Sequence, residues 1–485
     1  MVERFLPLVH AKGTHFEIGN AIGEQCKKKI EDQIDFYSHL LKEEFGMSWK
    51  KAVSTAKKYL PACEKAVPEL LEELRGMAAG SGRTFEELFA INCFEEIMFE
   101  LSHKKNACTG VAISSEYAKD KCVYLAHNED WLSGDKGHQF MIRASPVGEP
   151  EFIAITYGAV LPTTGLNSEG IAHSSNSQGH VDFKEVGVPC MFISRKILSS
   201  KTVEEAIGFA TMQDRASGTN HLIVDDKGAM CTIETSANEH NITRNRKYAI
   251  HSNHYISQKM EKYNFAEDKD SLKRYSLGKS LVSKELKNID YPVLKVIMSN
   301  HGEGDELQPD PYALCQHANR AYTPMDQDET ISSIIINLTT RTVWACKGSP
   351  CKNNFKEYKF DIKEEVKKEE TKEEKKEEKK EAKEEKEQKK ETKQEEKKEE
   401  DKEEEEAKKM YWTAVSKLKA IAAKKKATAA KCPACGEEKK EAVKEIAKEK
   451  QKEEVKEEKK ETKESKPVEK SENPEKSEKP EKSEK

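Results

Sequence analysis

The sequence predicts an α+β fold in which helices pack over a largely antiparallel double sheet. Through the first hundred residues, apolar side chains recur at the spacing of amphipathic helices. After Cys108 the chain changes to short strand-like segments bounded by turn residues, and two helical segments interrupt them. Strands, two central helices and further strands are typical of helices packed on a layered sheet.

The amino-terminal region predicts a strand and a turn followed by a series of helices. Gly13, Gly19 and Gly23 stand where a helix must approach a neighbouring element closely. Thr84 followed by Glu87 is a capping-box pattern that opens a helix. The expected helices are residues 21–45, 49–60, 69–79 and 84–99, with breaks at Pro61, Pro68 and 80–82.

The region after Cys108 predicts short strands and a few helices. The helix at 202–211 opens on Thr202 and Glu205, which again have capping spacing. The last two strands form a hairpin across residues 338–341. The expected strands are 110–114, 122–127, 140–144, 152–157, 171–174, 221–224, 230–234, 247–251, 331–337 and 342–346, and the expected helices are 188–199, 202–211, 270–284 and 291–300.

Composition divides the chain into a foldable part and a charged tail. A length of 485 residues suggests two or three domains. Residues 361–485, however, are mostly Lys and Glu and lack the apolar surface of a core. We therefore expect a helical region at 1–107, a mixed region at 108–360 and a low-complexity tail. The net charge of −5 indicates no one-sided basic field, so nucleic acid is not an expected partner.

The sequence also predicts a cellular location. The first eight residues include an early acid and no apolar core of a signal peptide. No stretch approaches the roughly 20 apolar residues that span a bilayer. We expect a cytoplasmic protein whose 12 cysteines are reduced.

Cys108 is the candidate nucleophile. It follows Ala107 and opens the strand at 110–114, and the paired segment 122–131 ends in a polar cluster that contains Asp130. Cleavage of the Ala107–Cys108 bond would give the thiol its own α-amine as a base, with a reference pKa of roughly 7.7–8.0. The alternative is an inert core cysteine, because free cysteines are usually buried.

Five motifs between residues 8 and 351 resemble the peptidase C45 group of N-terminal nucleophile hydrolases, the acyl-coenzyme A:6-aminopenicillanic-acid acyltransferase family. The resemblance implies an αββα sandwich and a precursor that cuts itself before the cysteine. The propeptide would then be 1–107, and both fragments would stay associated. Ala107 replaces the glycine that the family usually has. The motifs are residues 13–19, 107–109, 126–131, 164–170 and 332–351.

The same resemblance implies roles for further residues. Asp130 would steady the α-amine, and Asn253 would belong to the oxyanion hole, because an amide N–H stabilises developing negative charge. Asn167 would direct its amide at the reacting carbonyl. His127 would contact the substrate, and Arg320 is either a binding-site cation or a surface arginine. For Asp130 and the two asparagines the alternative is a turn residue.

The implied reaction is acyl transfer or hydrolysis at a non-peptide amide or thioester, with a small-molecule substrate. No cofactor is expected and no metal site in the core. The alternative from another class is a catalytically inactive scaffold that acts through its charged tail. Fragments of 1–107 and 108–485 on a denaturing gel would favour the enzyme.

Within the tail, residues 410–431 predict a basic amphipathic helix, because Trp412, Val415, Leu418 and Ile421 recur at three-residue steps. Such a helix lies on an anionic membrane, fills a partner's groove or docks on the enzyme. Cys432 and Cys435 form a C-x-x-C without a second pair at zinc-finger spacing, which is incidental or loosely metal-binding.

Overall fold

The computed structural model describes a folded unit and isolated positions in the tail. Chain contacts separate Met1–Glu364 from Glu365–Lys485. The described residues are 4–102, 107–178, 182–264, 269–304, 312–318, 328–360 and positions between 405 and 421. Met410 and Ile421 are described as helical and exposed, whereas Arg320, Cys432, Cys435 and most of 410–431 lie outside the described residues.

Within the described residues, the strands form an eight-stranded and a six-stranded sheet. Only β1 and β4 pair in parallel among the described strands; the other pairs are antiparallel. The larger sheet has the order β1 (Leu8–Gly13), β4 (Gln139–Pro146), β5 (Phe152–Tyr157), β6 (Thr164–Asn167), β7 (Ile171–Ser177), β8 (Thr219–Asp225), β9 (Met230–Thr235) and β10 (His240–Asn245). The smaller sheet has the order β11 (Tyr248–His251), β2 (Ala107–Ile113), β3 (Tyr124–Leu132), β12 (Asp328–Asn337), β13 (Thr342–Lys347) and β14 (Phe355–Lys359).

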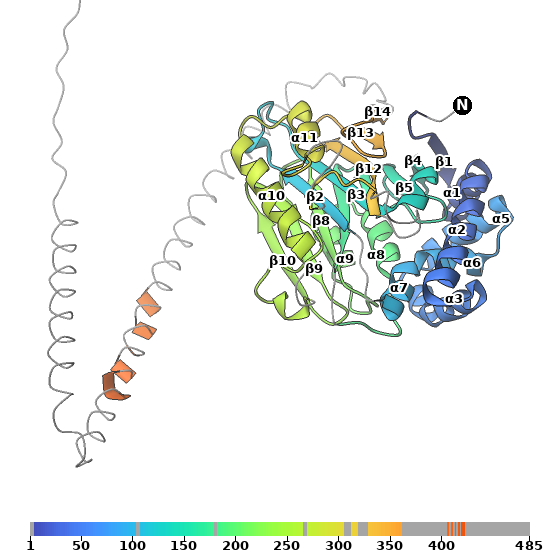
Figure 1. Ribbon diagram of the computed structural model, residues 1–485, viewed down its shortest axis with the longest axis horizontal. Helices are drawn as coiled ribbons and strands as arrows, with labels where there is room; N and C mark the ends of the chain where they lie inside the picture. Colours follow the sequence, from blue (N-terminus) through green and yellow to red (C-terminus); the bar gives the residue numbers. More distant parts are fainter. Residues whose placement is uncertain are drawn as a thin grey trace, which may run out of the picture. The chain divides into compact units, whose positions relative to one another are not determined.

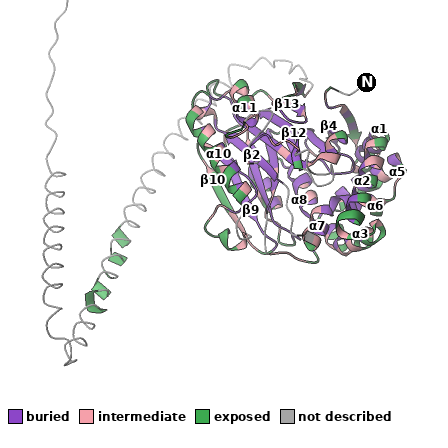
Figure 2. Ribbon diagram, in the orientation of Figure 1, coloured by how far each residue is buried: buried purple, intermediate pink, exposed green. Residues whose placement is uncertain are grey.

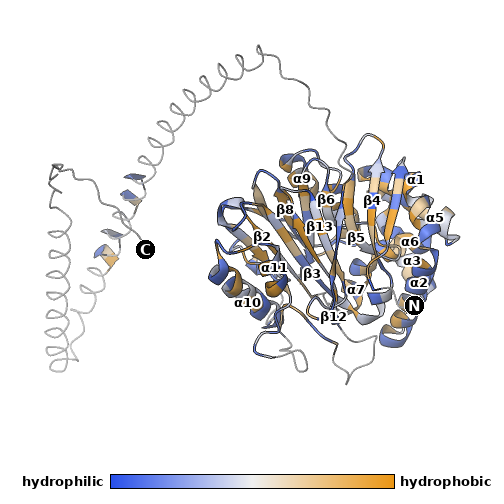
Figure 3. Cartoon of the chain, turned by 90° about the horizontal axis from the view of Figure 1, so that it is seen from above, coloured by the Kyte–Doolittle hydropathy of each residue, from blue (hydrophilic) through white to orange (hydrophobic). Residues whose placement is uncertain are grey.

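The two sheets pack face to face, with helices on both outer sides. One apolar cluster joins Leu125 and Ile334 of the smaller sheet to Leu166 and Leu222 of the larger one. Seen from above, α9 lies on one side of the strands and α10 and α11 lie on the other (Figure 3). The α-helices are α1 (His15–Gln25), α2 (Lys27–Phe45), α3 (Trp49–Ala56), α4 (Leu60–Ala66), α5 (Pro68–Ser81), α6 (Phe85–Asn92), α7 (Phe94–Ser102), α8 (Cys190–Ile197), α9 (Val203–Ala210), α10 (Lys269–Glu285) and α11 (Tyr291–Met298).

Each outer face has its own apolar cluster. Val282 of α10 and Leu294 of α11 pack against Val111 and Ile335 of the smaller sheet. The amino-terminal helices gather beside β1 and β4 (Figure 1) and share a cluster with α8, α9 and the larger sheet. The strands between these layers are mostly buried (Figure 2). These layers confirm the αββα sandwich that the resemblance implied.

Local signals predicted many element ends correctly. Thr84 and Glu87 form the capping box of α6, and Thr202 caps α9. The expected helices at 21–45 and 84–99 are each broken, at Cys26 and Cys93. Pro61 does not interrupt a helix but lies in the first turn of α4. Strands β6, β10 and β14 were not predicted. Among the described residues, no helix has the length and apolar character that crossing a bilayer requires.

Glycines let α1 and α5 touch backbone to backbone. A Cβ on Gly19 would stand 1.7 Å from the carbonyl oxygen of Glu73, and one on Gly76 would stand 1.9 Å from that of Phe16. Gly23 and Gly80 make equivalent contacts one turn further along. No larger residue fits at these positions unless the two helices move apart, as the glycines at 19 and 23 predicted.

A buried charge cluster fastens this helical region to the rest of the unit. Glu73 of α5 accepts two hydrogen bonds from Arg195 of α8, at 3.2 and 2.9 Å, and both side chains have no exposed surface. His15 Nδ1 lies 2.9 Å from the same carboxylate, and Glu149 lies on its other side. Burial opposes protonation of His15, but the hydrogen bonds to Glu149 and Glu73 outweigh it and raise its pKa to about 9.

We predict that Gly19→Ala and Gly76→Ala each lower the free energy of unfolding by about 1–3 kcal/mol, because the added methyl forces α1 and α5 apart. Gly208→Ala in α9 is the matched control, since nothing lies within 4 Å of its Cβ position. It should be neutral or raise stability by about 0.5–1 kcal/mol. Urea unfolding measures all three, and equal effects in the three variants would contradict this account.

We also predict that His15→Gln lowers the free energy of unfolding by an amount that depends on pH. The folded pKa of His15 is raised, to about 9 from 6.5, so protonated His15 stabilises the fold fully below pH 6.5. That contribution disappears as the pH rises through 9. The variant should lose about 2–3 kcal/mol at pH 6 and little at pH 10, in urea titrations. His39→Gln, an exposed histidine of α2, should show no such slope.

Candidate active site

Cys108 is the second residue of β2, and the β2–β3 register decides which side chains surround it. Cys108 pairs with Glu129, Ala107 with Asp130, and Gly110 with His127. Directly paired residues of antiparallel strands share a face, and alternate residues point to opposite faces. The Cys108 thiol therefore shares one face with Glu129 and His127, whereas Asp130 lies on the opposite face with Ala107.

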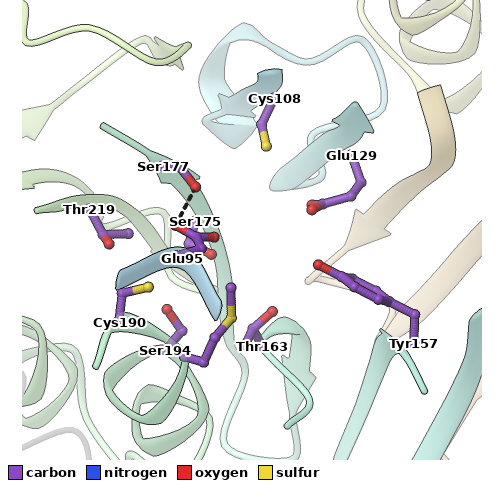
Figure 4. A pocket seen from close by; sticks show the side chains of 11 residues that line it. Glu95, Cys108, Glu129, Tyr157, Thr163, Ser175, Ser177, Cys190, Ser194 and Thr219 are labelled. Atoms are coloured by element: carbon purple, nitrogen blue, oxygen red, sulfur yellow. Dashed lines mark hydrogen bonds between the residues drawn. The ribbon is translucent and has the colours of Figure 1, made fainter. Parts of the chain in front are cut away.

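The thiol face borders a small pocket. The Cys108 thiol points into it, together with Glu129 of β3, Tyr157 of β5 and Glu95 of α7 (Figure 4). Ser177 donates a hydrogen bond of 2.7 Å to Glu95 across this space. The pocket volume of about 20 Å³ holds roughly one water molecule. A substrate therefore enters only if the lining moves.

Three groups with metal-ligating or catalytic chemistry meet at the thiol. Donor atoms of Cys108, His127 and Glu129 all lie within 4.8 Å of one another. His127 Nε2 is 3.0 Å from Glu129 Oε2, and its Nδ1 has no hydrogen-bond partner among the described residues. His127 therefore lies beside the Cys108 thiol and contacts Glu129.

The backbone of Cys108 is held from the other side by Arg274 of α10 and Asn253, which follows β11. The amide N–H of Cys108 donates to Asn253 Oδ1 at 2.9 Å. The Arg274 guanidinium donates to the Cys108 carbonyl oxygen at 2.7 Å and to Asn253 Oδ1 at 2.8 Å. Asp270, one turn earlier in α10, pairs with the same guanidinium at 3.1 Å. Both peptide bonds of Cys108 are thus fixed by side chains from distant segments.

Asp130 is fully buried beside the Ala107–Cys108 bond. The Thr330 hydroxyl donates to Asp130 Oδ1, and Oδ2 has no hydrogen-bond partner among the described residues. Burial raises the pKa of Asp130 to about 8, and Arg274 and the Thr330 hydrogen bond offset only part of that rise. The carboxyl group is therefore mostly protonated near neutral pH.

The thiol of Cys108 is also kept in its neutral form. Burial raises its pKa well above the usual value, and the negative charge of Glu129, joined by that of Asp130 once it ionises, raises it further. Arg274 opposes this effect without overcoming it. A thiol is a poor nucleophile until it ionises, so Cys108 of the intact chain reacts only when a neighbouring base takes its proton.

The structure brings together some of the proposed site residues and separates others. Asn253 contacts Cys108 directly. Asn167 does not line the pocket: its Nδ2 donates to the carbonyl oxygens of Leu198 and Ser200, and its Oδ1 accepts from the Ile171 amide. Those bonds tie the end of β6 to β7 and to the segment after α8.

Sequence reasoning missed Arg274, Glu129 and Glu95. A signal for Arg274 was present, because it falls on the α10 face that carries Ser271, Gly278 and Val282, all buried. An arginine on the apolar face of a predicted helix indicates a buried ionic contact. Glu129 was quoted in the motif at 126–131, but its partner across the strands could not be read from one segment.

We predict that Arg274→Met lowers the free energy of unfolding by about 3 kcal/mol, because it removes the side-chain donor of the buried Cys108 carbonyl and the partner of Asp270. Lys279→Met, an exposed cation on the same helix, should change it by less than about 0.5 kcal/mol. Urea unfolding of both variants makes the comparison. Equal free energies of unfolding in the two variants would show that the Arg274 guanidinium does not stabilise the fold.

Known proteins resemble this chain over its folded part. It is 26% identical over 249 residues to a β-alanyl-dopamine/carcinine hydrolase of Drosophila melanogaster, covering 47% of this chain and 63% of that protein. It is 25% identical over 199 residues to an acyl-coenzyme A:6-aminopenicillanic-acid acyltransferase, 40 kDa form, of Emericella nidulans, covering 41% and 54%. The alignments thus span between half and two thirds of either relative's length.

A solved structure of the N-acylethanolamine-hydrolyzing acid amidase ortholog of Caenorhabditis elegans aligns at 13% identity and a TM-score of 0.34, over 48% of this chain and 93% of that one. Such a score supports no conclusion about this site. The family match is more direct, since residues 117–352 match the family described as acyl-coenzyme A:6-aminopenicillanic acid acyl-transferase. The matched segment includes Asp130, Asn167 and Asn253 and begins after Cys108. Residues 117–352, just under half of the chain, are thus similar to this acyl-transferase family.

Proposed function

We propose that this chain is the precursor of a self-processing cysteine enzyme that transfers or hydrolyses the acyl group of a small non-peptide amide or thioester. Cys108 is the nucleophile, and cleavage of the Ala107–Cys108 bond activates it. The observation that carries the proposal is the position of Cys108: its thiol points into a pocket while Asn253 and Arg274 hold its backbone. An inert core cysteine needs no such support.

Processing begins when the Cys108 sulfur adds to the carbonyl carbon of Ala107. The thiol proton passes to the Glu129 carboxylate on the same face, the C–N bond breaks, a thioester forms, and the nitrogen of Cys108 takes up a proton. Asp130 is suited to supply it, because it is protonated near neutral pH and pairs with Ala107 across the strands. Water then hydrolyses the thioester, which leaves a carboxylate on Ala107 and a free α-amine and thiol on Cys108.

Turnover uses the groups that processing releases. The α-amine takes the thiol proton, and the thiolate attacks the substrate carbonyl. Developing negative charge on the carbonyl oxygen is stabilised by N–H donors, to which Asn253 contributes its side-chain amide. In the intact chain that amide donates to the Ser177 carbonyl at 2.9 Å, so substrate must replace or share this acceptor. Protonated amine then donates to the leaving group, and water or a second amine releases the acyl group.

The same fragments hold together after cleavage in this proposal. Strand β1 of the 1–107 fragment pairs along its length with β4, and Glu73 of α5 is buried against Arg195 of α8. Separating the fragments would break a strand pair and expose a buried ion pair, which is strongly unfavourable.

Glu129, together with the ionised fraction of Glu95, whose pKa burial raises to about 7, favours a substrate with a positive charge near the scissile bond. Glu95 and Glu129 line the space around the thiol, and no described lysine or arginine lines it. A polyanion such as coenzyme A would meet repulsion there. One relative is named as a β-alanyl-dopamine/carcinine hydrolase. We therefore rank aminoacyl amides of small amines above acyl thioesters as substrates.

The arrangement of His127 and Glu129 supports a competing route. A Cys108–His127–Glu129 set could ionise the thiol in the uncut chain, as cysteine–histidine pairs do elsewhere. If the chain is instead a catalytically inactive scaffold that acts through its charged tail, it needs neither cleavage before Cys108 nor substrate turnover.

We predict two fragments, 1–107 and 108–485, in the purified wild-type protein, with Cys108 at the amino terminus of the larger one. Cys108→Ala should abolish both cutting and turnover because no sulfur remains to attack. Cys122→Ala, a neighbouring buried cysteine outside the pocket, should retain both. Denaturing gels, intact mass and amino-terminal sequencing measure the cutting.

Turnover is measured as amine release from a β-alanyl amine and from its uncharged N-acetyl counterpart, with the charged amide hydrolysed faster. His127→Gln should still be cut. Full-length chain alone, with turnover, would favour the His127 route. Full-length chain without turnover would favour the scaffold.

A further inference from the structure

Four metal-ligating side chains converge at the end of the smaller sheet, away from the Cys108 pocket. His301 follows α11, Cys315 and His317 lie on the segment 312–318, and Cys351 follows β13. One donor atom from each lies within 4.8 Å of every other. Cys315 is buried and the other three are partly buried. Their sequence spacing matches no standard metal motif, which is why sequence reasoning expected no metal here.

The distances fit the edges of a tetrahedron around one ion. The two sulfurs are 3.6 Å apart, and His317 Nε2 lies 3.6 Å from Cys315 Sγ and 3.3 Å from Cys351 Sγ. His301 Nε2 and His317 Nε2 are 3.2 Å apart. With Zn–S bonds of about 2.3 Å and Zn–N bonds of about 2.0–2.1 Å, a tetrahedral site has edges of roughly 3.8, 3.6 and 3.3 Å for S–S, S–N and N–N.

We propose that His301, Cys315, His317 and Cys351 bind one structural zinc ion. Two thiolates balance the charge of Zn²⁺, and two neutral imidazoles complete a Cys₂His₂ set. Because the protein fills all four positions, no site is left for water or substrate, which marks a structural site and not a catalytic one. A simple chain of hydrogen bonds does not require all four donors to meet at one point.

The ion would fix a segment that has no regular structure of its own. Residues 312–318 form no helix or strand, and they are held by a few bonds such as Cys315 N–H to the Asn300 carbonyl at 3.0 Å. Gln316 and Thr330 exchange two hydrogen bonds, at 2.8 and 3.1 Å. The Thr330 hydroxyl in turn donates to Asp130. Zinc therefore supports the residue that orients the carboxyl beside the Ala107–Cys108 bond.

Two neighbours of the cluster serve as controls. Lys352 is exposed, and its Nζ lies 3.2 Å from His317 Nδ1. A neutral histidine that binds zinc through Nε2 carries its proton on Nδ1, so Lys352 turns to solvent when the ion binds. Cys346 of β13 is buried but points elsewhere, with its thiol 3.5 Å from the Gly348 carbonyl oxygen.

The test is the metal content of the full-length protein, which is purified without added metal or chelator and analysed by inductively coupled plasma mass spectrometry. We expect about one zinc per chain. Cys315→Ser and Cys351→Ser should each lower the zinc content about tenfold or more, whereas Cys346→Ser and Lys352→Ala should retain it. Cobalt(II) added to chelator-stripped protein should give the intense visible absorption of a tetrahedral thiolate site.

Measurements on the wild-type protein keep the test decisive if the serine variants fail to fold. Thiol-blocking mercurials should release the zinc, and a chelator should lower the melting temperature, with recovery on adding Zn²⁺. The proposal is overturned by wild-type protein that is metal-free and does not take up zinc after thiol reduction. It is equally overturned by a Cys315–Cys351 disulfide that persists in reductant, or by zinc retained in folded Cys315→Ser.

Discussion

The geometry around Cys108 depends on one buried cation. The Arg274 guanidinium has no exposed side-chain surface, and its donors are shared among the Cys108 carbonyl, Asn253 and Asp270. A buried charge is tolerated only when its donors are satisfied, so the backbone at Cys108 cannot shift without leaving donors on Arg274 unpaired. The same cation lowers the pKa of the Cys108 thiol and of the Asp130 carboxyl, against the effect of burial on both. Helix α10, the start of β2 and the end of β11 are thereby fixed to one another.

The same pocket explains why the Cys108 thiol is in its neutral form in the intact chain. Burial and two nearby acids favour the neutral thiol, and the pocket has room for about one water. Helix α7, which contributes Glu95, lies immediately before the segment that leads into β2. In the proposed sequence of events, cutting at Ala107 provides both missing components, a base for the sulfur and a free end that lets the lining move.

Sequence patterns correctly predicted the features that depend on interactions between residues close together in the chain. The capping box at Thr84, the cap at Thr202 and the hairpin of β12 and β13 follow from neighbours in sequence, and the structure confirms them. Strand β10 was missed because it lies at a sheet edge and is largely exposed, so it lacks an apolar face.

Contacts between distant segments were beyond such reasoning. The resemblance named Asn253, which does contact Cys108, but it also named Asn167, whose amide is used by backbone carbonyls. Arg274 is 166 residues from Cys108, and Cys351 is 36 from Cys315. A single sequence shows which residue types are present. Which of them lie close together in space is decided by the packing of the sheets and helices.

The backbone contact between α1 and α5 has an evolutionary consequence. Both helices carry glycine, three arbitrary residues and glycine again, at 19 and 23 and at 76 and 80. Along this contact none of the four glycines leaves room for a side chain. The family match begins only at residue 117. The twin glycine spacing therefore offers a signature by which the amino-terminal region can be traced in chains too diverged for overall identity to reveal it.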